Sequence, residues 1–187
     1  ALGATSVATH QLAMTIWAFL AFVLDAIAIA AQAITGRYLG AGDVLATRAV
    51  TNRMVAWGLV SGVVTGLALA ASSPVLGYLF TDDREVRALL WPVLLVAAVF
   101  QPVAGVVFVL DGVLIGAGDG RYLAWGGIAV LAVFVPMLWL TVRASRDATA
   151  LPPLVWLWVA FGLGFMVSRA VVLLRRARGT AWLVTGT

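Results

Sequence analysis

Two carboxylates stand in otherwise apolar stretches of this 187-residue sequence, each at the end of the same tetrapeptide. The tetrapeptide Phe-Val-Leu-Asp ends at Asp25 within TIWAFLAFVLDAIAIAAQAI and at Asp111 within QPVAGVVFVLDGVLIGAGD. Apolar surroundings penalise an ionised carboxylate, and a nearby cation or a bound proton relieves that penalty. A carboxylate in such a place can therefore take up and release a proton, which is the chemistry that couples transport to a proton gradient.

Asp25 is the deeper of the two by sequence. It lies eleven residues before Gly36, so about 16 Å of helix would separate it from that helix end. A charged residue at mid-membrane costs at least roughly 2.5–3.5 kcal/mol, and we do not expect Asp25 to face lipid. Its helix face repeats a small or polar residue at every seventh position, a spacing that keeps side chains on one face: Gln11, Ala18, Asp25 and Gln32. This stripe favours the wall of a wet cavity or an ion path, with a helix-packing seam as the alternative.

Asp111 lies about 10 Å inside the corresponding helix end. Gln101 precedes it by ten residues on the same helix. Two interpretations remain open for Asp111: a functional carboxylate, or an interface carboxylate whose partner is an N–H group or an arginine such as Arg169. Arg169 itself is six residues from Arg175, and we expect its long side chain to extend to the membrane surface.

The elements that must position these residues are predicted to cross a membrane. The sequence is 63% hydrophobic and 11% charged, with a mean hydropathy of +1.06, whereas a soluble domain has about 25% charged residues. A soluble chain of this length has too little interior for so much apolar surface. The absence of cysteine and the single histidine exclude disulfides and thiolate or histidine-cluster metal sites. The net charge of +4 comes from arginines between apolar runs, which fits membrane topology better than nucleic-acid binding.

Five apolar runs are long enough to cross a bilayer, which takes about 20 residues: 9–35, 54–78, 86–117, 122–142 and 153–174. They lack the alternation of barrel strands, so helices are predicted. The expected fold is all-α, a polytopic bundle forming a single membrane domain over residues 1–187. The third run contains Pro92 and Pro102, which predicts a kinked or strongly tilted helix.

The pattern Gly-Ala-Gly-Asp occurs in two of the connections. A glycine just past a helix end tolerates the left-handed cap, and an aspartate there can cap the next helix. We therefore expect capping to explain the motif residues of both copies: Gly40, Gly42 and Asp43 in the first, and Gly116, Gly118 and Asp119 in the second. Asp82 and Glu85 have the spacing of a capping box and receive the same interpretation.

The arginines predict the orientation of the chain. If all five runs cross, the first and third connections and the C-terminal tail share one side. That side carries Arg37, Arg48, Arg53, Arg121, Arg175, Arg176 and Arg178, against Arg84, Arg87, Arg143 and Arg146 on the other. Because arginine accumulates on the cytoplasmic side, the C-terminus is predicted to be cytoplasmic.

The stretches ATHQLAMTIWAFLAFVLDAIAIAAQAITGRYLGAGD and QPVAGVVFVLDGVLIGAGDGRYLAW resemble the multidrug and toxic compound extrusion (MATE) transporters, most closely the DinF-like branch. The resemblance is strong from about Leu2 to Trp125 and weaker beyond. It implies helices eight to twelve of a twelve-helix transporter, in its C-terminal lobe, with His10 and Gln11 in motif positions at the start of helix eight. The N-terminal lobe and the seventh helix would then lie outside this sequence, and we expect the chain to be a piece of something longer.

The resemblance implies a secondary active antiporter of the plasma membrane that exports organic compounds, expected to be cationic, in exchange for protons or sodium ions. In the sodium-coupled branch an acid follows a Phe/Tyr-Gln pair in helix ten. Here Phe100 and Gln101 form that pair, and Ala104 stands near the place of the acid. This departure favours protons over sodium. The expected partners are membrane lipid, a small organic cation and the N-terminal lobe, without which we expect no transport.

Other classes remain as alternatives. A flippase for lipid-linked sugars would share the architecture, but its cavity is expected to carry arginines that meet pyrophosphate, and Arg169 is the single mid-span candidate. A non-transporting membrane subunit is a further possibility. An enzyme is disfavoured, since the sequence offers no Ser/His/Asp set, metal cluster, cofactor motif or phosphate-cradling loop. The candidate ion-coupling or cleft-lining residues are Asp25, Gln32, Gln11, Asp111 and Gln101, and His10 at a span end is expected to pack or hydrogen-bond.

Overall fold

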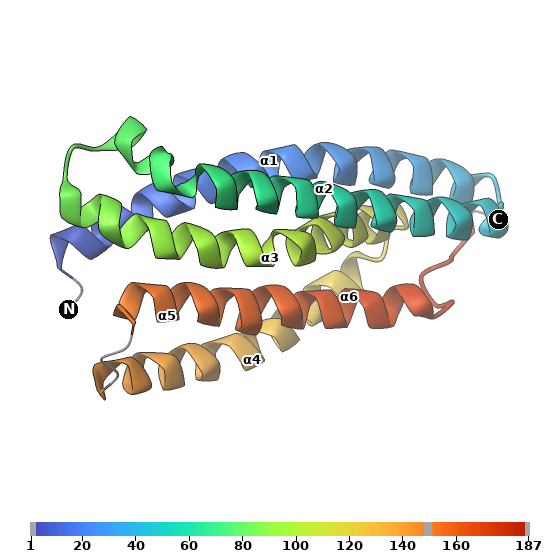
Figure 1. The fold of residues 1–187 in the computed structure, drawn as a ribbon. Helices are drawn as coiled ribbons and strands as arrows, with labels where there is room; N and C mark the ends of the chain where they lie inside the picture. The colour runs from blue at the N-terminus through green and yellow to red at the C-terminus, as the bar shows by residue number, and fades with distance from the viewer. Residues whose placement is uncertain (1–2, 148–150, 186–187) are drawn as a thin grey trace.

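The computed structural model describes residues 3–147 and 151–185, and within them all regular structure is helical. The elements in chain order are α1 (Ala4–Gly40), α2 (Val44–Phe80), α3 (Arg84–Gly116), α4 (Gly120–Asp147), α5 (Pro153–Ala160), the π-helical segment η1 (Phe161–Val167) and α6 (Ser168–Arg178). The last three follow one another without interruption and form a single rod, drawn in orange and red in Figure 1.

Within the described ranges, five helical rods are long and apolar enough to cross a membrane, and the predicted all-α membrane bundle is confirmed. Most of the rods begin before and end after the apolar runs that identified them. The first rod, for example, covers 4–40 rather than 9–35. Helical hydrogen bonding continues through the polar residues of the membrane interface until a cap ends it, so apolarity alone underestimates helix length.

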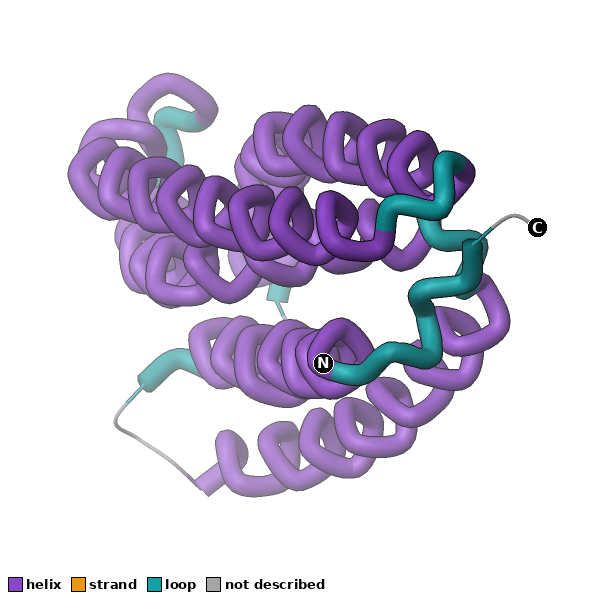
Figure 2. Tube along the Cα trace, turned by 90° about the vertical axis from the view of Figure 1, so that its right-hand side faces the viewer, coloured by secondary structure: helices purple, strands orange, loops and turns teal. Residues whose placement is uncertain are grey.

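Helix α3 is the centre of the bundle. It packs against α1 and α2 on one side and against α5, η1 and α6 on the other. Figure 1 shows α1, α2 and α3 side by side, with the α5–α6 rod along α3 and α4 crossing below at an angle. The view along the helices in Figure 2 separates the same two groups. Helix α3 therefore meets every other span, whereas α1 meets mainly α2 and α3.

Glycines let three helices approach closely. Gly58, Gly62 and Gly66 follow one another at four-residue intervals on α2 and are buried against α3. A methyl group on Gly62 would overlap the carbonyl oxygen of Gln101, and one on Gly105 would overlap that of Gly58. Small residues at such intervals are a common device for packing membrane helices. The sequence GLVSGVVTG carries this signal.

The contact between α1 and α3 fixes their relative register. Methyl groups on Gly112 and Gly116 would overlap the carbonyl oxygens of Ala28 and Gln32, respectively. Residues 84 apart in sequence are therefore level on these two helices, and both run in the same direction through the bundle (Figure 1). This register sets the relative depth of the two Phe-Val-Leu-Asp copies.

The two Gly-Ala-Gly-Asp turns have the same geometry. Gly42 and Gly118 adopt positive φ angles of 75° and 73°, and the N–H groups of Asp43 and Asp119 each donate to a carbonyl five residues earlier at 2.9 Å. This is the Schellman arrangement, in which glycine takes the left-handed position. The predicted left-handed role is therefore confirmed for Gly42 and Gly118, whereas Gly40 and Gly116 are the last residues of their helices.

The predicted aspartate caps are confirmed only in part. The Asp43 carboxylate accepts from the Ala46 N–H at 2.8 Å and caps α2 as expected. The cap of α3 is Asp83, which accepts from the N–H groups of Glu85 and Val86, rather than Asp82. The expectation that the Asp119 side chain caps α4 was wrong. Its carboxylate binds the Arg176 side chain instead.

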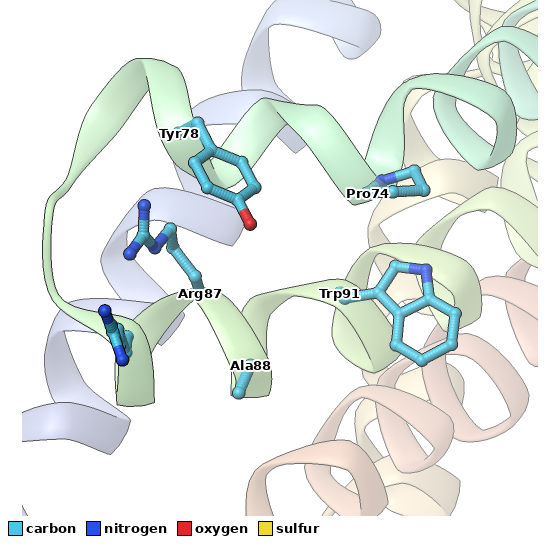
Figure 3. Close-up of a pocket in the computed structure, with 6 residues that line it drawn as sticks. Pro74, Tyr78, Arg87, Ala88 and Trp91 are labelled. Atoms are coloured by element: carbon cyan, nitrogen blue, oxygen red, sulfur yellow. The ribbon is translucent and has the colours of Figure 1, made fainter.

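The prolines do not interrupt α3, which runs through Pro92 and Pro102 as one helix. Pro74 lies inside α2, and Figure 3 shows the last turns of that helix, which carry Tyr78, displaced from its body beyond this proline. The irregular winding of the fifth rod does not come from a proline. Its seven π-helical residues, FGLGFMV, have no proline, and they place Gly162 against Phe100 and Gly164 against Phe134.

Candidate functional site

Asp25 lies at the edge of the packed face of α1. Its neighbours Leu24 and Ala28 are buried, whereas Asp25 itself is half-buried. Within residues 3–147 and 151–185, the Asp25 carboxylate makes neither an ion pair nor a side-chain hydrogen bond. Asp25 is therefore a carboxylate without a described partner in a membrane-spanning helix.

The rest of the predicted polar stripe faces outward. Gln11, Ala18 and Gln32 are all exposed on the surface of these five rods. The stripe is thus not a seam that joins α1 to its neighbours in this chain, since α1 packs through Ala13, Trp17, Leu24 and Ala31 instead. Polar side chains that the described helices leave exposed are suited to face water, a ligand or another part of a larger protein.

Asp111 has a different environment, although it ends the same tetrapeptide. The Arg169 guanidinium on α6 binds it in a bidentate manner, with Nη2 2.6 Å from Oδ1 and Nε 3.3 Å from Oδ2. The Asp111 side chain is 28% exposed and the Arg169 side chain is 15% exposed. The expectation that Arg169 extends to the membrane surface was wrong, because the guanidinium finds a carboxylate in the neighbouring helix. The arginine partner considered for Asp111 is present.

Two adjacent glycines of α4, Gly126 and Gly127, lie beside the Arg169 guanidinium. A methyl group on Gly126 would lie 3.6 Å from Nη1 of Arg169, and one on Gly127 would lie 3.9 Å from the same atom. This nitrogen also donates to the carbonyl oxygen of Leu123 at 3.3 Å. Arg169 therefore joins α3, α4 and α6 at one point.

A second ion pair extends this connection toward the helix ends. Nε and Nη2 of Arg176 bind the Asp119 carboxylate at 2.6 and 3.1 Å. The guanidinium also stacks over the Tyr122 ring, 4.7 Å from its centroid, and the Tyr122 hydroxyl donates to the Val172 carbonyl at 2.8 Å. We refer to the two pairs, Asp111–Arg169 and Asp119–Arg176, as the arginine latch.

The second pair of the latch was not predicted from the sequence. The available signal was a matched spacing, because the two acids are eight residues apart and the two arginines are seven apart on one face of a helix. The second copies of the two repeated motifs, which end at Asp111 and Asp119, are thus each paired with an arginine of α6.

The relative depth of Asp25 and Asp111 also differs from the expectation. The register of α1 and α3 places Asp111 level with Ile27, only about 3 Å along the axis from Asp25 at 1.5 Å per residue. Counting inward from each helix end misjudged the difference, because α3 ends level with Gln32 and α1 continues to Gly40, about two turns further. The two carboxylates differ in their neighbours and hardly in their depth.

Gln101 is part of the packed interface between α2 and α3. It is 1% exposed, and its backbone lies against Gly62. Its Oε1 has no hydrogen-bond partner among the described residues. The structure thus places Gln101 in the core of the bundle, apart from the outward stripe of α1.

His10 lies near the start of α1, at the opposite end from the latch. It borders a cavity of about 250 Å³ between α1, α4 and α5, lined also by Met14, Phe134, Leu157, Trp158 and Phe161. The ring meets Trp158 edge-on, with 6.0 Å between centroids. The packing role expected for His10 agrees with this aromatic contact.

Another cavity, of about 650 Å³, is remote from the acids of the stripe and the latch. It lies where α2 ends and α3 begins, and Figure 3 shows Tyr78 and Arg87 on one side of it and Trp91 on the other. The Arg87 guanidinium lies over the Tyr78 ring, 4.3 Å from its centroid. Arginine with tyrosine and tryptophan at a span end is typical of anchoring at the membrane–water interface.

The comparisons with known proteins agree with the fold. The MatE family model matches residues 1–140. Protein DETOXIFICATION 42 of Arabidopsis thaliana is 32% identical over 99% of this chain and 33% of its own length. A probable multidrug resistance protein NorM of Bradyrhizobium diazoefficiens is 31% identical over 91% of this chain and 37% of its own length. Multidrug resistance protein MdtK of Edwardsiella ictaluri is 28% identical over 97% of this chain and 39% of its own length. The chain thus spans about a third of the length of the relatives it matches.

Proposed function

The chain belongs to the MatE family of membrane transporters, and we propose that it forms part of an antiporter that exports organic cations in exchange for protons. Relatives that carry the name multidrug resistance protein support the efflux part of this proposal. The remaining helices would complete the transporter, since the chain covers about a third of these relatives. The expected N-terminal lobe is part of the same proposal.

The observation that carries the proposal is the contrast between the two mid-span carboxylates. Arg169 neutralises Asp111, whereas Asp25 has no ion-pair partner in the described ranges. Asp25 also lies on the face of α1 whose Gln11 and Gln32 side chains are left exposed by the described helices. Of the two acids, Asp25 is therefore the one whose carboxylate is available to bind a proton or a cation.

One carboxylate in such a position is sufficient to couple two fluxes. When Asp25 is ionised, its negative charge attracts an organic cation on the outward face of α1, and low local polarity strengthens that attraction. When a proton binds an Asp25 carboxylate oxygen, the charge disappears and the cation loses its counter-ion. Because the proton and the cation exclude each other from one carboxylate, entry of one favours release of the other, which is the condition for antiport. Gln11 and Gln32 would supply hydrogen bonds along the same stripe.

Two alternatives receive less support. A flippase for pyrophosphate-linked lipids would need an available arginine in the spans, but Asp111 already occupies the Arg169 guanidinium. Sodium coupling through α3 would need a side-chain oxygen where Ala104 stands, and this alanine is buried in the core. Proton coupling through Asp25 requires neither.

The proposal includes a plasma-membrane location with a cytoplasmic C-terminus. The turns after α1 and α3 lie at the same end of the bundle as the C-terminus, and the N-terminus lies at the other end (Figure 1). The predicted excess of arginine belongs to that C-terminal end, which supports its assignment to the cytoplasm.

The test uses the complete transporter in vesicles, with efflux of a fluorescent organic cation driven by a pH gradient. We expect Asp25→Asn to reduce efflux to the rate of protein-free vesicles, because asparagine takes up no proton in this range. Asp43→Asn is the matched control, since asparagine caps a helix as well as aspartate does and the exposed Asp43 has only that role. Normal pH-driven efflux by the Asp25→Asn variant would remove Asp25 from the mechanism.

A further inference from the structure

A groove unrelated to Asp25 separates α2 from α6 at the arginine-rich end of the bundle. Both helices pack on α3 but make little contact with each other. The space between them is a cavity of about 400 Å³. Its part nearest the helix ends is polar, with Arg48, Thr51 and Asn52 from α2 and Arg178 from α6. Deeper along the helices, it is lined by the apolar side chains of Val55, Leu110 and Leu174. The groove is thus amphipathic along its length.

Thr51 is a buried donor that the protein leaves unused. Thr51 is only 5% exposed, and its Oγ1 has no hydrogen-bond partner among the described residues. The hydroxyls of Thr9, Thr47 and Thr65 each donate to a carbonyl four residues earlier. A buried hydroxyl without a partner is costly, so the Thr51 hydroxyl indicates a missing acceptor in the groove.

The charges of the groove specify that acceptor. Nη2 of Arg48 donates to the Gly179 carbonyl at 3.1 Å, which ties this side chain to the end of α6 and leaves other guanidinium N–H groups available. Neither Arg48 nor Arg178 belongs to the two ion pairs found within the described residues. Two arginines and an unpaired hydroxyl around one space are suited to an anion with several acceptor oxygens, such as a phosphate group.

We propose that this groove binds an anionic phospholipid. The phosphate lies between Arg48 and Arg178 and accepts a hydrogen bond from Thr51, and an acyl chain follows Val55, Leu110 and Leu174 into the membrane. The apolar floor favours a lipid over free phosphate, because a soluble ion would leave that surface uncovered. Basic pockets between transmembrane helices on the cytoplasmic side are a known setting for anionic headgroups. This site is separate from the proposed antiport chemistry and does not depend on it.

The test measures binding of phosphatidylglycerol to the 187-residue chain in neutral detergent, by native mass spectrometry and by thermal stabilisation. Phosphatidylcholine, glycerol phosphate and inorganic phosphate are the comparison probes. The variants are Arg48→Gln, Arg178→Gln and Thr51→Val, and Arg53→Gln is the control, because Arg53 is exposed on α2 and does not line the groove. We expect phosphatidylglycerol to bind at least about tenfold more tightly than phosphatidylcholine, and each groove arginine variant to lose about tenfold, as for one charge-assisted hydrogen bond.

Thr51→Val separates a ligand role from a folding role. Without lipid we expect this variant to unfold at the same or a higher temperature, because valine removes an unsatisfied hydroxyl while keeping the shape. With phosphatidylglycerol we expect it to gain less stabilisation than the unmodified chain. An equal loss of binding in Arg53→Gln would overturn the proposal in favour of diffuse surface charge. Equal stabilisation by inorganic phosphate would overturn it in favour of a free anion.

Discussion

The stripe on α1 and the arginine latch on α3 begin from the same four residues and reach opposite outcomes. Asp25 and Asp111 each follow Phe-Val-Leu and lie within about 3 Å of the same level in the bundle, by the helix register and the rise per residue. One carboxylate is held by an arginine at 2.6 Å, and the other has no ion pair within the described ranges. Local sequence and depth therefore do not decide what a membrane carboxylate does; the neighbouring helix does.

The position of each helix explains the difference. Helix α3 is central and has the α5–α6 rod along one side, so Arg169, near the start of α6, can reach it. Helix α1 is peripheral and packs mainly on α2 and α3, which leaves the face of Gln11 and Gln32 open. The central acid stabilises the bundle, and the peripheral acid remains available.

Breaking the deeper pair of the latch is expected to have the largest effect on stability. Arg169→Leu leaves the Asp111 charge without a counter-ion in a span, which costs about 3–5 kcal/mol for a buried pair that loses one member. Denaturant unfolding of the chain in detergent micelles measures this cost. Adding Asp111→Asn to the same variant should restore most of the stability, because the uncompensated charge disappears. A loss of less than about 1 kcal/mol in Arg169→Leu would contradict the stabilising role given to the latch.

The outer pair of the latch should matter less. Asp119 and Arg176 are 12% and 23% exposed near the helix ends, where water can replace part of the lost contact. Arg176→Gln is expected to lower the unfolding free energy by about 1 kcal/mol, at the upper end for partly exposed pairs. Arg175→Gln, at the exposed neighbouring position, should change it by less than about 0.5 kcal/mol. Equal effects of the two variants in the same unfolding assay would show that the Asp119–Arg176 pair is not specific.

The smallest change in stability is expected at Asp25. Asp25→Asn removes no described ion pair or hydrogen bond, so the unfolding free energy should change by no more than about 0.5 kcal/mol. The same variant is the one expected to abolish pH-driven efflux. A stability loss comparable to that of Arg169→Leu would mean that Asp25 is a structural residue, and the contrast between the two regions would fail.

The architecture was predictable because a bilayer dictates it. Long apolar runs must become helices, and the glycines of the two Gly-Ala-Gly-Asp turns end helices by a local mechanism that a short sequence reveals. The Asp43 cap is local for the same reason, since its partner is three residues away.

The latch and the helix register were not predictable in this way. Arg169 and Asp111 are 58 residues apart in sequence, and only the packing of α6 on α3 brings them together. The depth of Asp111 was misjudged because helix ends are not aligned across the bundle. The four-residue glycine spacing on α2 was visible, but its partners on α3 appear only in three dimensions.

The π-helical segment Phe161–Val167 ends two residues before Arg169, and it constrains how this span can change in evolution. A π turn closes its hydrogen bond over one residue more than an α turn, so the segment accommodates an extra residue without forming a loop. Losing that residue would restore α-helical winding and rotate everything after it by about 100°. Arg169 and Arg176 would then point away from their partners, Asp111 on α3 and Asp119 in the turn that follows α3. A single-residue deletion in FGLGFMV would therefore disconnect both arginines at once, although neither arginine would be altered.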